Sequence, residues 1–157
     1  METDKNFIPK EVYETIVDKM PVCTVDVIFL NKQKNKTLLF KRNNNPLKGE
    51  YFSIGGKLNK DETFLECAIR QAKMEIGLEI DPEKTIFIGV QREYYPNSAF
   101  DGISYTAVDL YFGYILDKQN LSLKLDEQHS ESKWFEINDK DLHPYIKSKI
   151  EQTLLIV

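Results

Sequence analysis

Residues 56–78 read GKLNKDETFLECAIRQAKMEIGL, and this stretch decides how the rest of the chain is interpreted. It follows Gly55, passes through a polar segment, and then has the apolar spacing of an amphipathic helix that ends at Gly77. This helix places Glu75 off its apolar stripe, one turn after Gln71. Hard cations such as Mg2+ bind backbone carbonyl and carboxylate oxygens. The stretch therefore predicts a metal site between the glycine loop and the helix.

Two further charged residues in this stretch have a structural interpretation. Glu62 and Arg70 have opposite charge and lie eight residues apart, so their pairing would brace the loop against the helix. Composition alone would favour an ordinary surface helix with solvated glutamate and arginine side chains. The spacing of the complete stretch argues against so simple a helix.

The composition is that of a globular protein, with 157 residues, 41% of them hydrophobic and 29% charged. This length suits one domain over residues 1–157. No apolar run approaches the roughly 20 residues that span a bilayer, and the N-terminus lacks a secretory pattern. Cys23 and Cys67 are interpreted as reduced packing residues. We therefore expect a cytoplasmic protein with no membrane partner, and the net charge of −4 argues against nucleic-acid binding.

Apolar periodicity predicts a sheet with helices at both ends of the chain. Val12, Ile16 and Met20 have helical spacing, which indicates a leading helix from Lys10 to Met20. A short strand and loop are expected over residues 121–128, and a closing helix over residues 142–156. Strands are expected in five ranges, the first two forming a hairpin: Val22–Leu30, Lys36–Arg42, Ile86–Tyr95, Tyr105–Leu116 and Lys133–Ile137. This order favours an α/β fold whose mixed sheet is covered on both faces.

The spacing of glycine, glutamate and arginine in the opening stretch resembles the Nudix box. The match runs through six residues: Gly56, Glu62, Arg70, Glu75, Gly77 and Leu78. The resemblance implies the Nudix fold, a mixed β-sheet sandwiched between helices. The full box has additional glutamates where this chain has Gln71 and Met74. Because one helix carboxylate is left, we expect one Mg2+ ion rather than several.

A similarly reduced box occurs in the GDP-mannose mannosyl hydrolases, and the chain resembles this subfamily beyond the box. The segment Asp126-Glu127-Gln128-His129, followed by Lys133-Trp134, is similar to the late motif of the subfamily. The resemblance implies that Gln128 coordinates Mg2+ together with the Gly55 carbonyl and Glu75. It also implies that His129 is the general base, and an imidazole with an ordinary pKa of about 6.5 suits that role near neutral pH.

The resemblance assigns a further set of residues to the substrate. Arg42 is implied to contact the diphosphate, and its planar guanidinium suits phosphate oxygens. Arg70 has two open interpretations, a diphosphate contact or a structural brace. Two positions depart from the subfamily, because Glu93 stands in place of a histidine and Asp109 in place of a tyrosine. The expected substrate-binding residues are Asp26, Arg42, Lys57, Arg70, Glu93, Tyr95 and Asp109.

The resemblance implies hydrolysis of a nucleoside diphosphate sugar, such as GDP-mannose, at the sugar C1. The products would be GDP and the free sugar, with inverted configuration. The alternatives are a Nudix pyrophosphohydrolase that cleaves a nucleotide or nucleotide sugar at phosphorus, and a weakly catalytic module that binds nucleotide sugars. The departures at Gln71, Met74 and Glu93 keep the last alternative open. The subfamily resemblance also implies a homodimer.

Overall fold

A mixed sheet with a single parallel strand pair organises the protein in the computed structural model, which describes residues 4–157. The main path of the sheet runs β3-β2-β1-β6-β5, while β4 pairs with β1 and β7 pairs with β2. Strands β1 and β6 are parallel, and the other described pairs are antiparallel. The strands span the following ranges: β1 Val22–Asn31, β2 Lys36–Arg42, β3 Tyr51–Phe52, β4 Ile54–Lys57, β5 Ile86–Tyr95, β6 Tyr105–Leu116 and β7 His129–Glu136.

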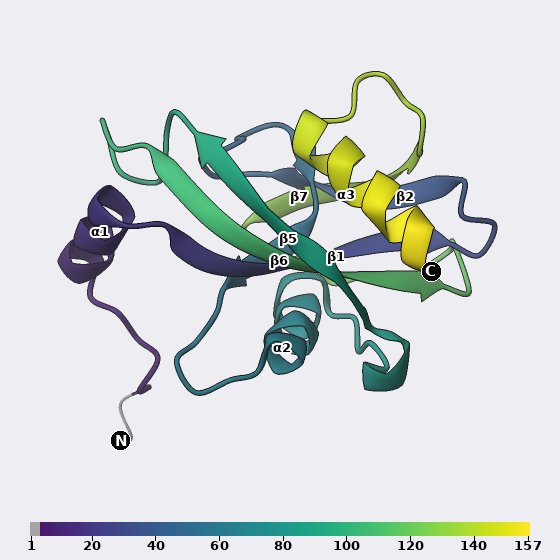
Figure 1. Ribbon diagram of the computed structural model, residues 1–157, viewed down its shortest axis with the longest axis horizontal. Helices are drawn as coiled ribbons and strands as arrows, with labels where there is room; N and C mark the ends of the chain where they lie inside the picture. The colour runs from purple at the N-terminus through teal and green to yellow at the C-terminus, as the bar shows by residue number, and fades with distance from the viewer. Residues whose placement is uncertain (1–3) are drawn as a thin grey trace.

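Helices lie on both faces of this sheet, which confirms the predicted α/β arrangement. Helix α2 (Phe64–Ile76) packs on β1 and β4, whereas α3 (Pro144–Ile156) packs on β5, β1 and β6. Figure 1 shows α3 above the strands and α2 below them. Helix α1 (Lys10–Lys19) lies at one end and contacts β6, and a short 3-10 turn covers Pro82–Lys84. No helix within residues 4–157 is long and apolar enough to cross a membrane.

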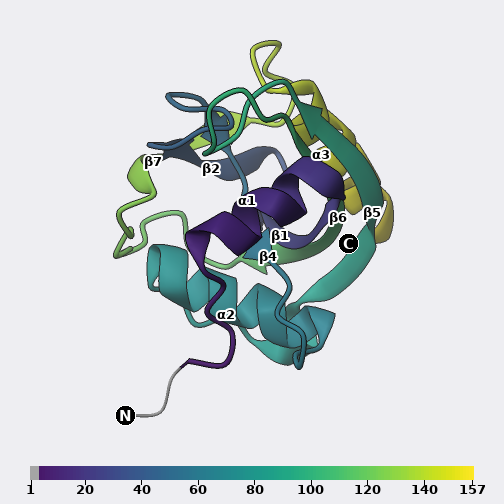
Figure 2. The ribbon, with the colours of Figure 1, turned by 90° about the vertical axis from the view of Figure 1, so that its left-hand side faces the viewer.

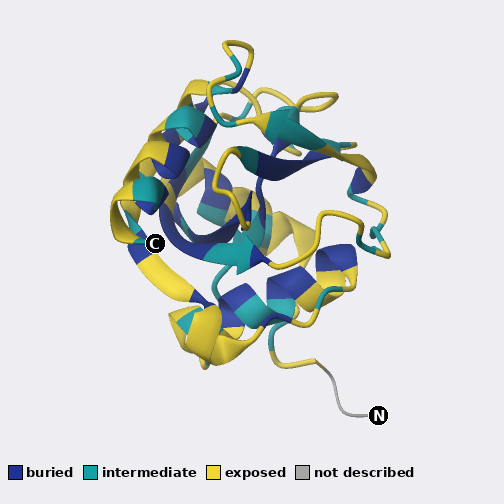
Figure 3. Ribbon diagram, turned by 90° about the vertical axis from the view of Figure 1, so that its right-hand side faces the viewer, coloured by how far each residue is buried: buried dark blue, intermediate teal, exposed yellow. Residues whose placement is uncertain are grey.

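Strand β1 divides the core because its side chains alternate between the two faces of the sheet. Val25, Val27 and Phe29 pack in the cluster under α2, and Ile28 and Leu30 pack in the cluster under α3. Figure 3 shows the buried strands between helices whose outer surfaces are exposed. The same alternation places the even-numbered polar residues of β1 on the face covered by α3.

Helix α2 is fixed at both ends by local sequence. Thr63 and Glu66 form a capping box at its N-terminus, in which each side chain accepts a hydrogen bond from the other residue's backbone N–H. Gly77 ends the helix with φ of 67°, a left-handed conformation that glycine adopts without steric cost. The predicted C-terminal cap is therefore confirmed, and the orientation of Glu75 depends on these two caps.

Three sequence predictions need correction. Residues 121–128 form a loop and contain no strand. The last strand begins at His129 rather than at Lys133. Its first residues are polar and exposed after His129, so they carry no apolar signal. The closing helix begins at Pro144, which is favoured at the first helical position.

Candidate functional site

A cavity of about 400 Å3 lies between α2, the glycine strand β4 and the ends of β1, β5 and β6. Helix α1 contributes Tyr13 and Val17 to its wall, and Figure 2 shows α1 in front of β1 and β4. Nine residues predicted for the site line this cavity: Asp26, Arg42, Gly55, Lys57, Arg70, Glu75, Glu93, Tyr95 and Gln128. Two others, Asp109 and His129, are buried and do not line the cavity.

Glu75 forms the centre of the predicted metal site. Its side chain is buried with 1% of the residue exposed, and its Oε2 accepts a hydrogen bond of 2.8 Å from the Gly55 backbone N–H. Burial, reinforced by the charges of Asp26 and Asp126, raises the pKa of Glu75 well above its usual value. A buried carboxylate surrounded by other carboxylates is stabilised by a cation, so this donor set fits a divalent metal ion.

The loop before β7 adds two residues to this site. The Asp126 backbone N–H donates to the Glu75 carbonyl at 2.8 Å, which fastens the loop to the last turn of α2. Ligand atoms of Glu75, Asp126 and His129 all lie within 4.8 Å of one another. The sequence prediction had Gln128, which does line the cavity, but gave Asp126 no role of its own. An acid three residues before a candidate catalytic histidine was the signal that could have identified Asp126.

His129 is held as a neutral imidazole. Its Nδ1 lies 3.0 Å from Asp126 Oδ1, and because a carboxylate only accepts, Nδ1 carries the proton and Nε2 the lone pair. Burial lowers the pKa of His129, although Asp126 opposes that effect. Nε2 is buried and has no hydrogen-bond partner among residues 4–157. The arrangement therefore prepares Nε2 as a base or a metal ligand.

Arg42 and Lys57 are the basic residues most available to a phosphorylated ligand. Arg42 Nε donates to the Pro46 carbonyl at 2.8 Å, and its two terminal nitrogens have no acceptor among the residues that the structure describes. Lys57 Nζ has one neutral partner, the Asn59 side chain at 3.2 Å. Both side chains therefore have donors left for phosphate oxygens.

Arg70 is committed to the predicted brace. Its Nε and Nη2 donate to the two carboxylate oxygens of Glu62 at 2.9 and 2.6 Å, and Nη2 also reaches the Lys57 carbonyl at 3.2 Å. Hydrogen bonding to Arg70 lowers the pKa of Glu62 to about 2. The pairing of Glu62 with Arg70 is thus confirmed, and it fixes the polar loop between β4 and α2.

Lys149 of α3 organises the opposite side of the cavity and was missed by the sequence analysis. It is fully buried, and its Nζ lies 3.0 Å from Asp26, 2.8 Å from Glu93 and 2.7 Å from Asp109. Burial disfavours the ammonium, but the three carboxylates outweigh it and raise the pKa of Lys149. Lys149 occupies a core position next to Ile150 on the buried stripe of α3. A lysine at such a position requires acidic partners, and this was the available signal.

Hydroxyl groups complete this polar cluster. Ser53 donates to Asp26 at 2.6 Å, and Thr24 donates to Asp109 at 2.7 Å. Burial and the charge of Asp26 raise the pKa of Asp109 well above its usual value. The two positions that depart from the mannosyl hydrolase pattern, Glu93 and Asp109, are therefore partners of one lysine.

The glycine loop, the candidate metal site and the sheet between helices form a cavity suited to a metal ion and a phosphorylated ligand. Comparison with known proteins identifies the family: the NUDIX domain model matches residues 20–154. The low-salt glycan biosynthesis protein Agl8 of Haloferax volcanii is 33% identical over 147 residues, which cover 92% of this chain and 89% of that protein. The chain belongs to the Nudix family of hydrolases.

One further relative and two solved structures are similar to this chain, the solved structures in their fold. An ADP-ribose pyrophosphatase of Methanocaldococcus jannaschii is 33% identical over 119 residues, which cover 76% of this chain and 64% of that protein. The MutT protein from Methanosarcina mazei Go1 has a similar structure, with a TM-score of 0.67, 19% identity and coverage of 87% of this chain and 96% of that one. The NUDIX domain of Shewanella oneidensis NrtR complexed with ADP ribose has a TM-score of 0.68, 18% identity and coverage of 94% and 98%.

Proposed function

We propose that the protein hydrolyses a nucleoside diphosphate sugar of the GDP-mannose type at the sugar C1, releasing GDP and the free sugar. The observation that carries this proposal is the single carboxylate, Glu75, that α2 presents to the cavity. Gln71 lines the cavity where a second acid would stand, and its side chain packs closely on Gly56. Attack at carbon requires charge stabilisation mainly on the departing diphosphate, and one cation with an arginine suits that demand.

The residues of the cavity divide this task. Gly55, Glu75 and Gln128 would hold one Mg2+, which when bound supplies positive charge to the diphosphate. Arg42 binds the same diphosphate through its two terminal nitrogens, and Lys57 adds a third donor group. These basic groups stabilise the leaving group as the bond between C1 and the diphosphate oxygen breaks.

His129 would act as the general base. Water adds its oxygen to C1, and the proton that it loses passes to His129 Nε2, which carries the lone pair. Asp126 holds the imidazole in this tautomer through Nδ1. Because His129 is buried and does not line the cavity, the role requires the loop before β7 to expose Nε2 when substrate binds.

A second candidate is hydrolysis at phosphorus. Asp126 and His129 lie close enough to Glu75 to enlarge the ligand set beyond the helix carboxylate, which favours a pyrophosphohydrolase. One relative is named an ADP-ribose pyrophosphatase. In this candidate His129 serves as a metal ligand instead of a base. A third candidate, a weakly catalytic binding module, corresponds to binding of nucleotide sugars without turnover.

Product analysis in water labelled with 18O tests the proposal. GDP-mannose and ADP-ribose are incubated with Mg2+, and the products are separated and weighed by mass spectrometry. Attack at C1 gives free mannose and GDP without 18O, whereas GMP, mannose 1-phosphate and label on phosphate would refute it in favour of the second candidate. Binding of either compound without any product would support the binding module.

The two histidines provide a matched pair of variants for the base. We expect His129→Ala to lower kcat by about 10^2-fold or more, which is the usual contribution of a general base. His143→Asn is the control, because His143 caps α3 by accepting from the Tyr145 N–H and asparagine is also a good cap. Full activity in His129→Ala would show that the base is another group.

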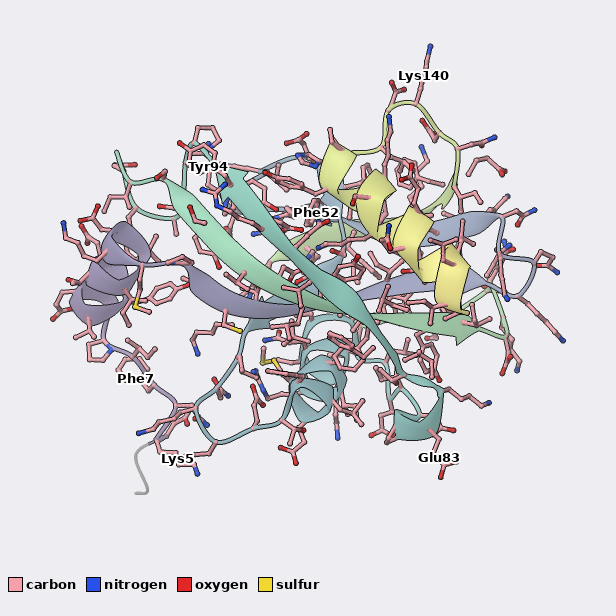
Figure 4. The ribbon with its side chains drawn as sticks, viewed as in Figure 1. Lys5, Phe7, Phe52, Glu83, Tyr94 and Lys140 are labelled. Atoms are coloured by element: carbon pink, nitrogen blue, oxygen red, sulfur yellow. The ribbon has the colours of Figure 1, made fainter. Side chains whose placement is uncertain are left out.

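The proposal includes a homodimer. Its support is the exposed apolar surface at the N-terminal end, where Val12 of α1 and Met20 just after it are exposed and the preceding Phe7 is 72% exposed. Figure 4 shows Phe7 beside α1 at the edge of the molecule. Light scattering on the purified chain measures the mass directly, and a monomer at micromolar concentration would contradict this part of the proposal.

A further inference from the structure

Three neighbouring strands direct acidic side chains to one buried lysine. Asp26 lies on β1, Asp109 on β6 and Glu93 on β5, and these strands are adjacent in the sheet. Lys149 reaches all three from α3, with Nζ to oxygen distances of 2.7 to 3.0 Å. Its Nζ also lies 5.1 Å from the ring centroid of Phe52, which Figure 4 labels beside α3. We call these three acids and Lys149 the Lys149 cluster.

The Lys149 cluster forms part of the cavity wall through Asp26 and Glu93. Both oxygens of Glu93 have protein partners, since Oε1 accepts from the Tyr95 hydroxyl at 2.7 Å and Oε2 from Gln91 at 2.6 Å. Asp26 differs, because Ser53 and Lys149 both bind its Oδ2. Within residues 4–157 no donor binds Asp26 Oδ1, although the residue is only 8% exposed. This oxygen is available to a ligand in the cavity.

The position of Asp26 Oδ1 places that ligand group next to the metal site. A Cβ on Gly55 would collide with Asp26 Oδ1, so the carboxylate occupies the space that the missing side chain leaves. The Gly55 N–H in turn binds Glu75. A group attached to a diphosphate at Glu75 would therefore lie next to Asp26. The proposed function places the reacting C1 beside the metal site, so that group is the glycosyl unit rather than the nucleoside.

We propose that the Lys149 cluster is a specificity determinant that admits neutral or cationic glycosyl groups and rejects anionic ones, such as uronic acids and phosphorylated sugars. This inference rests on the proposed function, because it concerns the sugar of the same substrate. Three carboxylates facing one ammonium leave the cluster net negative, whether or not Asp109 carries a proton. Sugar hydroxyls or an ammonium donate to Asp26 Oδ1, whereas a second carboxylate finds no donor there and is repelled. Lys149 acts as a positioning residue, since it fixes Asp26 Oδ2 and turns Oδ1 to the cavity.

Binding of two matched ligands tests this inference. GDP-mannose has a hydroxymethyl group at C6 of the sugar, and GDP-mannuronate has a carboxylate there but is otherwise identical. GDP alone is the reference. Titration calorimetry with Ca2+ measures each Kd, and turnover with Mg2+ gives KM and kcat. We expect GDP-mannose to bind at least about tenfold more tightly than GDP-mannuronate, and the difference to appear in Kd and KM rather than kcat.

Two variants assign the selectivity to the cluster. Glu93→Gln removes one negative charge and keeps hydrogen-bonding groups, so the ratio of the two Kd values should fall at least about threefold. Glu151→Gln is the matched control on the exposed surface of α3 and should leave the ratio unchanged. Lys149→Met removes the positive charge and should increase the ratio, if circular dichroism shows that it folds. Glu93→Gln tests the inference even if Lys149→Met does not fold.

The outcomes separate this inference from the proposed function. Equal affinity for the two sugar nucleotides, or an unchanged ratio in Glu93→Gln, overturns the charge selection and leaves hydrolysis at C1 intact. Selective binding without release of GDP supports the charge selection and overturns the proposed function. Failure to bind either ligand overturns both.

Discussion

Loss of the Glu62 charge should destabilise the protein by an amount that depends on pH. Glu62→Gln removes the ion pair between the loop after β4 and α2, in which Arg70 donates twice to the carboxylate. Because Arg70 lowers the pKa of Glu62 from 4.5 to about 2, the folded protein holds the carboxylate charged more strongly than the unfolded chain does. The pair therefore stabilises the folded state.

The magnitude follows from this pKa change. At about 1.36 kcal/mol per pH unit, the full change from 4.5 to about 2 corresponds to about 3.4 kcal/mol. This value is an upper limit, because the Arg70 side chain is 32% exposed and solvent screens the pair. We expect Glu62→Gln to lower the free energy of unfolding by about 1–2 kcal/mol at pH 7.

The pH dependence has a definite sign. A carboxylate with a lowered pKa in the folded state stabilises fully above about pH 4.5 and loses that contribution as the pH falls toward 2. Urea unfolding of wild type and Glu62→Gln in EDTA at pH 7, 5, 4 and 3 measures this, with the exposed Glu151→Gln as control. The two curves should converge as the pH falls. A difference that stays constant from pH 7 to 3, or a loss below about 0.3 kcal/mol at pH 7, would refute the assignment of Arg70 as a brace.

Two further predictions concern the metal site and the cap of α2. Glu75→Gln should weaken Mn2+ binding in calorimetry by at least about tenfold, and unchanged Mn2+ affinity would contradict the assignment of Glu75 as a metal ligand. The same variant should have a higher melting temperature in EDTA. Burial raises the pKa of Glu75, so its negative charge destabilises the folded protein when no cation is bound. Gly77→Ala should cost about 1–2 kcal/mol in urea unfolding, since its φ is 67° and a Cβ would lie 3.0 Å from Lys124 Cβ. Gly102→Ala is the comparison, with φ of 75° and nothing within 4 Å, and should cost less; equal losses would exclude the contact with Lys124.

Local patterns explain what the sequence could predict of the fold. Strands β5 and β6 and the hairpin of β1 and β2 are confirmed because their apolar runs are continuous and bounded by turn residues. The start of β7 was not predicted, because its exposed polar residues differ little from a loop. The sequence analysis did not predict which face of α1 packs, since a helix with apolar residues on two sides gives no local indication of the buried one.

In the candidate site, too, local sequence patterns predicted the residues better than the contacts between them. Asp26, Glu93 and Asp109 were each predicted, but their common partner Lys149 is 123 residues from Asp26 and comes from a helix whose packing direction no local pattern reveals. The metal side was easier, because Gly55 and Glu75 belong to one continuous stretch with a fixed spacing. The metal side of the site could thus be predicted because its residues are close along the chain. The Lys149 side could not, because only tertiary packing brings its residues together.

Gly55 joins these two halves in a way that constrains how the protein can change. Its N–H orients the carboxylate of Glu75, and its missing side chain makes room for the carboxylate of Asp26. Any larger residue at this position would displace one anion toward the glycosyl side and disturb the other at the metal. Substitutions meant to alter sugar preference without loss of metal affinity should therefore keep Gly55. They should be made at Glu93 or Lys149, which contact Asp26 or its partners but not Glu75.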